Sequence, residues 1–258
     1  MAFKLSEFWE AALNLVFPPV CQLCREERAS AAEGYVGGDC FSKVHFVVAP
    51  FCERCGLPYG GSISNSFVCS NCPDMDLHFS FARSAVVAKG VVLDAIHHYK
   101  YNRALCFEPF LANLLIQQAV PMLQNQGWDM IVPVPLHASK LREREFNQAE
   151  RLARHLGRAA KIPVNNRLVA RVKCTATQTQ LTRPERAGNV HQAFALRKGK
   201  KLDGEKIILL DDVLTTGATT SACAQVLRQA GASEVGVWTV ARGLLMGHPI
   251  GDTESDPL

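Results

Sequence analysis

The sequence predicts an α/β protein in which helices cover both faces of a parallel β-sheet, preceded by a small cysteine-rich module. Short apolar runs alternate with segments of helical spacing across residues 79–245, which is the pattern of such a sheet. Seven of the ten cysteines lie within residues 21–72, where long-range periodicity is weak. We therefore expect a cysteine-rich module at 1–78, an α/β domain at 79–245 and a disordered tail at 246–258.

The α/β domain is expected to begin with a strand. The predicted elements are a strand at 81–88, a helix at 104–123, a strand at 130–135, a helix at 147–160, an extended segment at 167–172, a strand at 206–210, a helix at 218–230 and a strand at 234–240. The run at 206–210 is continuously apolar, as in a central parallel strand. Pro109 should disturb the first turns of the helix at 104–123, and Gly231 should end the helix at 218–230.

The first twenty residues form a short amphipathic lead-in that Glu7 and Glu10 interrupt. This lead-in lacks the basic start and the cleavage site of a signal peptide, and the chain has no run of about 20 apolar residues. We therefore expect a cytoplasmic protein with no membrane insertion. Paired cysteines in that compartment are typical of metal ligands rather than disulfides. The scattered Cys106, Cys174 and Cys223 are expected to fill the core.

Two CxxC pairs, Cys52 with Cys55 and Cys69 with Cys72, are separated by thirteen residues. Each pair can present two thiolates to one tetrahedral zinc ion. Four thiolates leave no open coordination position for a substrate. The sequence therefore predicts a structural zinc site of the ribbon type.

The segment 207–219 carries the strongest functional signal. Its apolar strand is followed by Asp211 and Asp212, at the carboxyl end where open α/β sheets bind ligands. Two adjacent carboxylates are costly without a partner. A helix start follows, whose N–H groups, hydroxyls and dipole suit an anion: Thr215, Thr216, Gly217, Ala218 and Thr219. The alternative is an ordinary strand, turn and helix with an acidic cap, but the three features in register favour a ligand site.

This stretch resembles the signature of type I phosphoribosyltransferases. The resemblance implies that Asp211 and Asp212 hold the 2′ and 3′ hydroxyls of a ribose, and that residues 215–219 bind its 5′-phosphate. It also implies that the ligand is phosphoribosyl pyrophosphate together with Mg²⁺. The expected fold is then that of a type I phosphoribosyltransferase with a zinc-ribbon module at its N-terminus.

Further motifs resemble the ComF family over residues 18–244. A Val-Pro-Val-Pro strand at 132–135 precedes Arg144, Phe146, Asn147 and Gln148, and Glu145 stands where the family usually has a glycine. A later block has the family spacing: Arg171, Thr175, Gln178, Leu181, Arg186, Asn189, Ala193 and Phe194. The resemblance implies a pyrophosphate-binding loop at Arg144 and a mobile loop over the substrate.

Three basic residues are candidates for ligand contacts on the same grounds. Arg171 and Arg186 are candidates for pyrophosphate binding, with an ordinary basic surface loop as the alternative. Lys100 lies in an Ile-His-His-Tyr-Lys-Tyr stretch that resembles the lysine-tyrosine element of the family. It is therefore a candidate for contact with the ligand.

The resemblance also implies a second zinc ribbon, starting with Cys21 and Cys24. Where the ComF pattern has a CxxC pair, this chain has Gly37-Gly-Asp-Cys40. Glycine cannot ligate a metal, so Cys40 would be the third ligand. Asp39 or His45 could supply the fourth, or the site could be weak or lost.

The charge distribution leaves two functions open. Residues 137–201 contain sixteen Lys and Arg against four Asp and Glu, a local charge of +12 in a chain of +4. Such a block is expected to meet a polyanion, although a solvated basic face has the same composition. One hypothesis is an enzyme in which a nitrogen nucleophile displaces pyrophosphate from phosphoribosyl pyrophosphate. The other, from the association of ComF proteins with competence and DNA use, is a non-catalytic module that binds single-stranded DNA or senses a ligand, working with DNA-uptake machinery. The sequence does not identify the acceptor.

Overall fold

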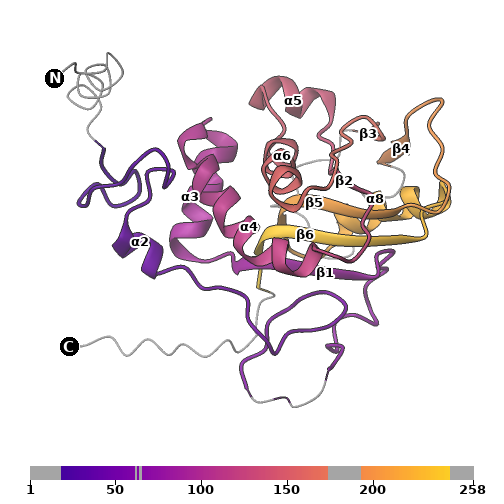
Figure 1. Cartoon of the computed structure of the whole chain (residues 1–258), viewed down its shortest axis with the longest axis horizontal. Coiled ribbons are helices and arrows are strands. Elements are labelled where there is room, and N and C mark those ends of the chain that lie inside the picture. The colour runs from indigo at the N-terminus through magenta and orange to yellow at the C-terminus, as the bar shows by residue number, and fades with distance from the viewer. Residues whose placement is uncertain (1–18, 62, 64–65, 174–192, 245–258) are drawn as a thin grey trace.

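The computed structural model describes residues 19–61, 63, 66–173 and 193–244 (Figure 1). Its main sheet is parallel and is built from β1 (Phe81–Val87), β6 (Glu234–Arg242), β5 (Lys206–Leu214) and β2 (Met130–Pro133), in that order. A separate antiparallel pair consists of β3 (Val169–Arg171) and β4 (Phe194–Leu196). The helices are α2 (Gly38–Ser42), α3 (Gly90–Tyr101), the short 3-10 helix η1 (Leu105–Phe107), α4 (Glu108–Leu123), α5 (Ala138–Arg144), α6 (Gln148–Ala160) and α8 (Ala218–Gln229).

Alternating side chains of the central strand divide the core into two layers. Ile208 and Leu210 of β5 are buried in the layer that contains α4 and α6. Ile207 and Leu209 are buried in the layer under α8, where Cys223 is fully buried as predicted. Because successive side chains of a strand point to opposite faces, the apolar run at 206–210 is buried on both sides. The parallel sheet flanked by helices confirms the predicted fold class.

Strand β5 is longer than the sequence predicted, and this changes the place of the two aspartates. Its pairing with β6 continues to Leu214, opposite Arg242, whereas its pairing with β2 ends at Leu210, opposite Pro133. Asp211 and Asp212 therefore lie inside β5, just beyond the end of β2. Pairing with β6 extends β5 past the aspartates. Because β2 has already ended there, the space beside Asp211 and Asp212 is open.

The first turns of the helix predicted at 104–123 are disturbed as expected: residues 105–107 form η1, and α4 begins only at Glu108. Pro109 occupies the first turn of α4, directly after η1. A proline at that position removes an N–H group that has no partner within the helix, and its fixed φ suits the helical conformation. Pro109 therefore helps to start α4 at the end of the 3-10 turn.

The cysteine-rich segment packs directly on the α/β domain. In Figure 1 its indigo part lies beside α3 and α4, and Cys21 and Cys40 share a buried cluster with Phe110 of α4. Further on, the Ala82 N–H of β1 donates to the Arg54 carbonyl at 2.9 Å. The lead-in, Cys174, Arg186 and the predicted tail lie outside the described residues, and the boundary at residue 78 stays a prediction. Within the described ranges, none of the helices has both the length and the hydrophobicity needed to cross a bilayer.

A buried carboxylate joins the three helices on one face of the sheet. Glu108, the first residue of α4, accepts a hydrogen bond from the Tyr99 hydroxyl of α3 at 3.1 Å and pairs with Arg151 and His155 of α6. Burial opposes ionisation of Glu108, but the hydrogen bonds from Arg151 and His155 outweigh it and lower its pKa. The ionised carboxylate thus holds α3 and α6 in place, and α3 carries Lys100.

We predict that Glu108→Ala lowers the free energy of unfolding by about 1–3 kcal/mol, because it leaves the buried Tyr99 hydroxyl without an acceptor. Denaturant unfolding at neutral pH would measure this loss. The matched control is Glu143→Ala, which removes an exposed pair with Lys140 and should change stability far less, because solvent screens such a pair. Equal losses in the two variants would contradict a structural role for Glu108.

Candidate functional site

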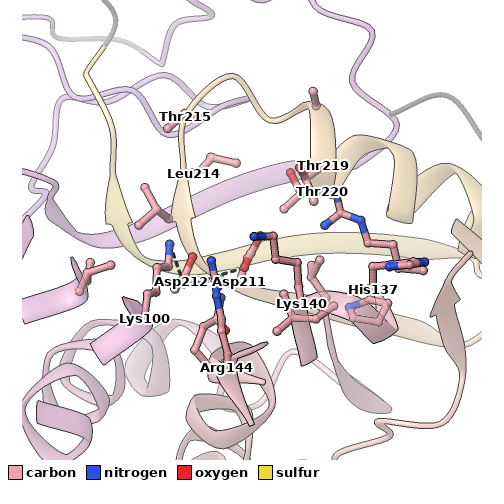
Figure 2. A pocket seen from close by; sticks show the side chains of 18 of the residues that line it. Lys100, His137, Lys140, Arg144, Asp211, Asp212, Leu214, Thr215, Thr219 and Thr220 are labelled. Carbon is pink, nitrogen blue, oxygen red and sulfur yellow. Dashed lines mark hydrogen bonds and ion pairs between the residues drawn. The ribbon is translucent and has the colours of Figure 1, made fainter. Parts of the chain in front are cut away.

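A cavity of about 650 Å³ opens at the carboxyl end of β5 (Figure 2). That volume lies in the range of small-molecule sites. The cavity is formed by α3, the loop after β2, α5, β3, the end of β5 and the start of α8. It therefore lies where the sheet ends and several connections meet, as ligand sites in open α/β sheets do.

The two aspartates lie side by side in this cavity but in different surroundings. Asp212 is 4% exposed and its carboxylate pairs with Lys100 Nζ at 2.8 Å. Asp211 accepts the backbone N–H of Asp212 on its own carboxylate at 2.9 Å. Burial and the charge of Asp212 raise the pKa of Asp211 to about 7, against the opposing effect of Lys100 and Arg171. One acid of the pair is thus neutralised by a lysine, and the other needs a further partner to stay ionised.

Basic side chains from three separate elements line the same cavity. Lys100 comes from α3, Lys140 and Arg144 from α5, and Arg171 from β3. Figure 2 shows Lys100 and Arg144 directed toward the aspartates. The Arg144 guanidinium also stacks on the Tyr101 ring at 5.0 Å. Cations on one side and carboxylates on the other suit a ligand that bears both phosphates and hydroxyl groups.

The turn between β5 and α8 has the form of an anion cradle. Gly217 has a φ of +78° and caps α8, a conformation that disfavours side chains with a Cβ. Residues 215–219 all line the cavity, and Thr215 is exposed. Free N–H groups at a helix start and threonine hydroxyls are the donors that a phosphate accepts from.

A buried arginine supports this turn from behind. Arg242, at the end of β6, is 1% exposed and donates to the carbonyls of Leu214 at 2.9 Å and Thr215 at 2.6 Å. Its other terminal nitrogen contacts Cys55 Sγ at 3.9 Å. Arg242 thus engages carbonyl oxygens that would repel an anion, and it links the turn to the cysteine-rich segment.

Glu145 adopts the backbone conformation that a glycine would favour. It ends α5 with a φ of 68°, in the left-handed region. Its carboxylate pairs with Arg103 at 2.8 Å. The departure from the family pattern therefore leaves the turn in place, and Glu145 carries the strain of a left-handed backbone.

The structure brings together all but one of the residues that the sequence singled out for ligand binding. Asp211, Asp212, Lys100, Arg144, Arg171 and residues 215–219 line one cavity, and Arg186 lies outside the described residues. Lys140 and Gln148 also line it and were missed as site residues. Gln148 is 4% exposed, and its Oε1 has no hydrogen-bond partner within the described part of the chain. Its place beside Asn147 in the Phe-Asn-Gln-Ala motif was the available signal.

The second cysteine cluster has the geometry of a tetrahedral metal site. Cys52, Cys55, Cys69 and Cys72 are buried, and neighbouring sulfurs lie 3.6 Å apart. Sulfurs bonded to one zinc ion at 2.3 Å are separated by about 3.8 Å, so the residues fit the ion. The Cys55 thiol and nearby backbone N–H groups lower the pKa of Cys52 to about 4 despite burial. A thiolate is therefore favoured there, as zinc binding requires.

The first cluster corrects the expectation for its fourth ligand. Cys21, Cys24 and Cys40 gather around the carboxylate of Glu27, with the four ligand atoms within 4.8 Å of one another. Among the described residues, neither Asp39 nor His45 belongs to a group that can hold a metal. Glu27 was not considered from the sequence because it lies ten residues before the vacant position at Gly37.

Comparisons with known proteins define the class of protein. A family model described as a double zinc ribbon domain matches residues 12–73, and one described as a phosphoribosyl transferase domain matches residues 146–248. The chain therefore combines a double zinc ribbon with a phosphoribosyltransferase fold. The matched residues include both cysteine clusters and about half of the residues that line the cavity, among them Asp211, Asp212 and the turn at 215–219.

Relatives named for competence or DNA use cover most of the chain. The DNA utilization protein YhgH of Salmonella typhi is 31% identical over 233 residues, covering 89% of this chain and 100% of that protein. Competence protein F of Haemophilus influenzae is 30% identical over 228 residues, covering 86% and 96%. Competence protein ComFC of Bacillus subtilis is 27% identical over 214 residues, covering 79% and 82%. The chain belongs to the ComF family.

We predict that Asp211→Asn stabilises the free protein, and that the gain depends on pH. A folded-state pKa raised from 3.8 to about 7 means that stability is lost as the pH rises through about 7. The variant should therefore raise Tm most at pH 8 and progressively less toward pH 4, by about 2–4 °C for each kcal/mol gained. Asp129→Asn makes the same chemical change beside the start of β5, where Asp129 accepts the Lys206 N–H, and is the control that should not reproduce the gain. A gain that is independent of pH would contradict the raised pKa.

Arg242→Gln is expected to loosen the turn at 214–219. It removes the donor of the part-buried Thr215 carbonyl and one of the two donors of the buried Leu214 carbonyl, which keeps the Gly243 N–H, at a cost of about 1–3 kcal/mol. Amide hydrogen exchange should therefore become faster in the turn. Arg228→Gln makes the same change at the other end of α8, where Arg228 bonds the Ala232 carbonyl, and should leave the turn unaffected. Unchanged exchange in the Arg242 variant would show that Arg242 does not support the turn.

Proposed function

We propose that this protein binds phosphoribosyl pyrophosphate with Mg²⁺ in the cavity and transfers its 5-phosphoribosyl group to a nitrogen nucleophile, with release of pyrophosphate. The observation that carries the proposal is the pair Asp211 and Asp212 beside the glycine turn at 215–219, inside a cavity lined by basic residues. Carboxylates suit the two ribose hydroxyls, and the turn suits the 5′-phosphate. Lys100, Arg144 and Arg171 line the same cavity, and we assign the pyrophosphate to them.

The chain's own residues would position the ligand and screen its charge. Lys100 already neutralises Asp212, so the cavity does not present two unpaired carboxylates to an incoming polyanion. Arg144 and Arg171 would stabilise the charge that develops on the departing pyrophosphate. Hydrogen bonds from the ribose hydroxyls favour the ionised form of Asp211, which burial disfavours in the free protein.

The cavity also fits a magnesium ion that arrives with the ligand. Mg²⁺ prefers oxygen ligands, often one or two carboxylates together with phosphate oxygens and water. Asp211 and Asp212 supply carboxylates, and the raised pKa of Asp211 reflects a need for nearby positive charge. When bound, Mg²⁺ would neutralise the pyrophosphate and make it a better leaving group.

The process served is proposed to be competence or DNA utilisation, as the names of the relatives suggest, in the cytoplasm where paired thiols stay reduced. A non-catalytic module that binds single-stranded DNA is the alternative. The basic block at 137–201 contains two phenylalanines and no tyrosine or tryptophan. Phe194 is buried and Phe146 packs on Tyr99 at 5.2 Å, so neither offers a free face for stacking a base.

Calorimetry with phosphoribosyl pyrophosphate and Mg²⁺ tests the binding step. We expect Asp212→Asn to weaken binding roughly 10- to 100-fold, because charge-assisted hydrogen bonds to the ribose are lost. Asp129→Asn is the control for the same chemical change at the far end of β5. Equal affinities for wild type and Asp212→Asn would contradict the proposed site.

Release of pyrophosphate in the presence of ammonia or a panel of nucleobases tests the transfer step. The proposal expects release with at least one acceptor and its loss in Asp212→Asn. Binding of single-stranded DNA at low salt, without any affinity for phosphoribosyl pyrophosphate, would favour the alternative. Competition between the two would place both anions in one groove.

A further inference from the structure

The Glu27 carboxylate occupies the space that a cysteine side chain at position 37 would need. A Cβ built on Gly37 would lie 2.1 Å from Glu27 Cδ and 2.5 Å from Oε1. Gly37 itself has an extended backbone, with a φ of −80°, that any residue can adopt. A side chain at position 37 would therefore meet the Glu27 carboxylate and require it to move, whereas the backbone conformation itself would accept any residue.

The backbone around Gly37 keeps the hydrogen-bond pattern of a metal-binding knuckle. In an intact pair, the first cysteine sulfur accepts N–H groups from the residues two and three positions later. The Cys55 N–H donates to Cys52 Sγ at 3.5 Å, and the Leu23 and Cys24 N–H groups favour the thiolate of Cys21 from the same positions.

At the incomplete knuckle these two donors point to Glu27. Its carboxylate accepts the Asp39 N–H at 2.9 Å and the Cys40 N–H at 3.1 Å, the groups two and three positions after Gly37. Glu27 thus receives the two hydrogen bonds that a thiolate at position 37 would receive. Its Oε1 also lies 3.7 Å from Cys24 Sγ, close to the separation of ligands on one zinc ion.

We propose that Glu27 is the fourth ligand of a second zinc ion, which Cys21, Cys24 and Cys40 complete. A carboxylate carries the same charge as a thiolate, so the net charge of the occupied site equals that of a four-cysteine site. Glutamate oxygen is an established zinc ligand. Its distance from the ion, about 2.0–2.2 Å, is slightly shorter than that of a thiolate sulfur. The first ribbon is therefore rebuilt with a ligand from another part of the chain, and the site is structural because no coordination position is open.

Metal analysis of the full-length purified protein tests this assignment. We expect two zinc ions per chain in the wild type and one in Glu27→Ala, because three thiolates alone hold zinc less tightly during dialysis against a chelator. Glu26→Ala is the matched control, since Glu26 is exposed and adjacent in sequence. Two zinc ions retained by Glu27→Ala, or only one in the wild type, would overturn the proposal.

A rescue variant separates ligation from a general loss of folding. Glu27→Ala combined with Gly37→Cys frees the occupied space and supplies a thiolate under the same two N–H groups, so it should restore two zinc ions per chain. Substitution with Co²⁺ gives a second readout. Thiolate-to-metal charge-transfer absorption should rise in the ratio of eight thiolates to seven between the rescue variant and the wild type. Failure of the rescue variant to regain the second ion, or equal absorption in both proteins, would contradict the assignment.

Discussion

The buried guanidinium of Arg242 is the contact on which the functional end of the molecule depends. It lies at the end of β6 and binds the carbonyls of Leu214 and Thr215, and it contacts the sulfur of Cys55. A planar guanidinium carries five donors in a rigid fork, so it can hold several acceptors at once in a fixed geometry. The sheet, the turn at 215–219 and the zinc ribbon therefore all contact the side chain of Arg242. A displacement of the ribbon would therefore reach the turn through this contact.

The acidic pair lowers the stability of the free protein in a way that ligand binding would reverse. Asp212 is matched by Lys100, whereas Asp211 is held where its ionisation is unfavourable. Strongly perturbed acids in a cleft are typical of functional sites, because the missing partner is the ligand. The proposed ribose hydroxyls and Mg²⁺ would supply it. The free protein therefore keeps a carboxylate whose ionisation is unfavourable, which selection for stability alone would not retain.

Two departures from the family pattern are compensated by distant residues in different ways. Glu145 replaces a glycine yet keeps its left-handed backbone, and Arg103 pairs with its side chain. Gly37 replaces a cysteine, and the carboxylate of Glu27 fills the vacated space under the same backbone donors. In both places the backbone geometry is retained while the side chain changes. The backbone turn and the ribbon are therefore the features that this protein keeps, while the side chains that support them differ from the family pattern.

The sequence by itself determined those features in which the necessary residues are adjacent. An apolar run, two acids and a glycine turn follow one another at 206–219, so local hydrophobicity and backbone preference were sufficient to predict the central strand, the helix start and the acid pair. The second cysteine cluster was predicted for the same reason, from two short pairs. Only the tertiary structure decided the end of β5, which its pairing with β6 sets, and the roles of Lys140, Gln148, Arg242 and Glu27. These side chains reach their partners through packing between elements far apart in the chain, and a contact of that kind leaves no periodic or local pattern in the sequence.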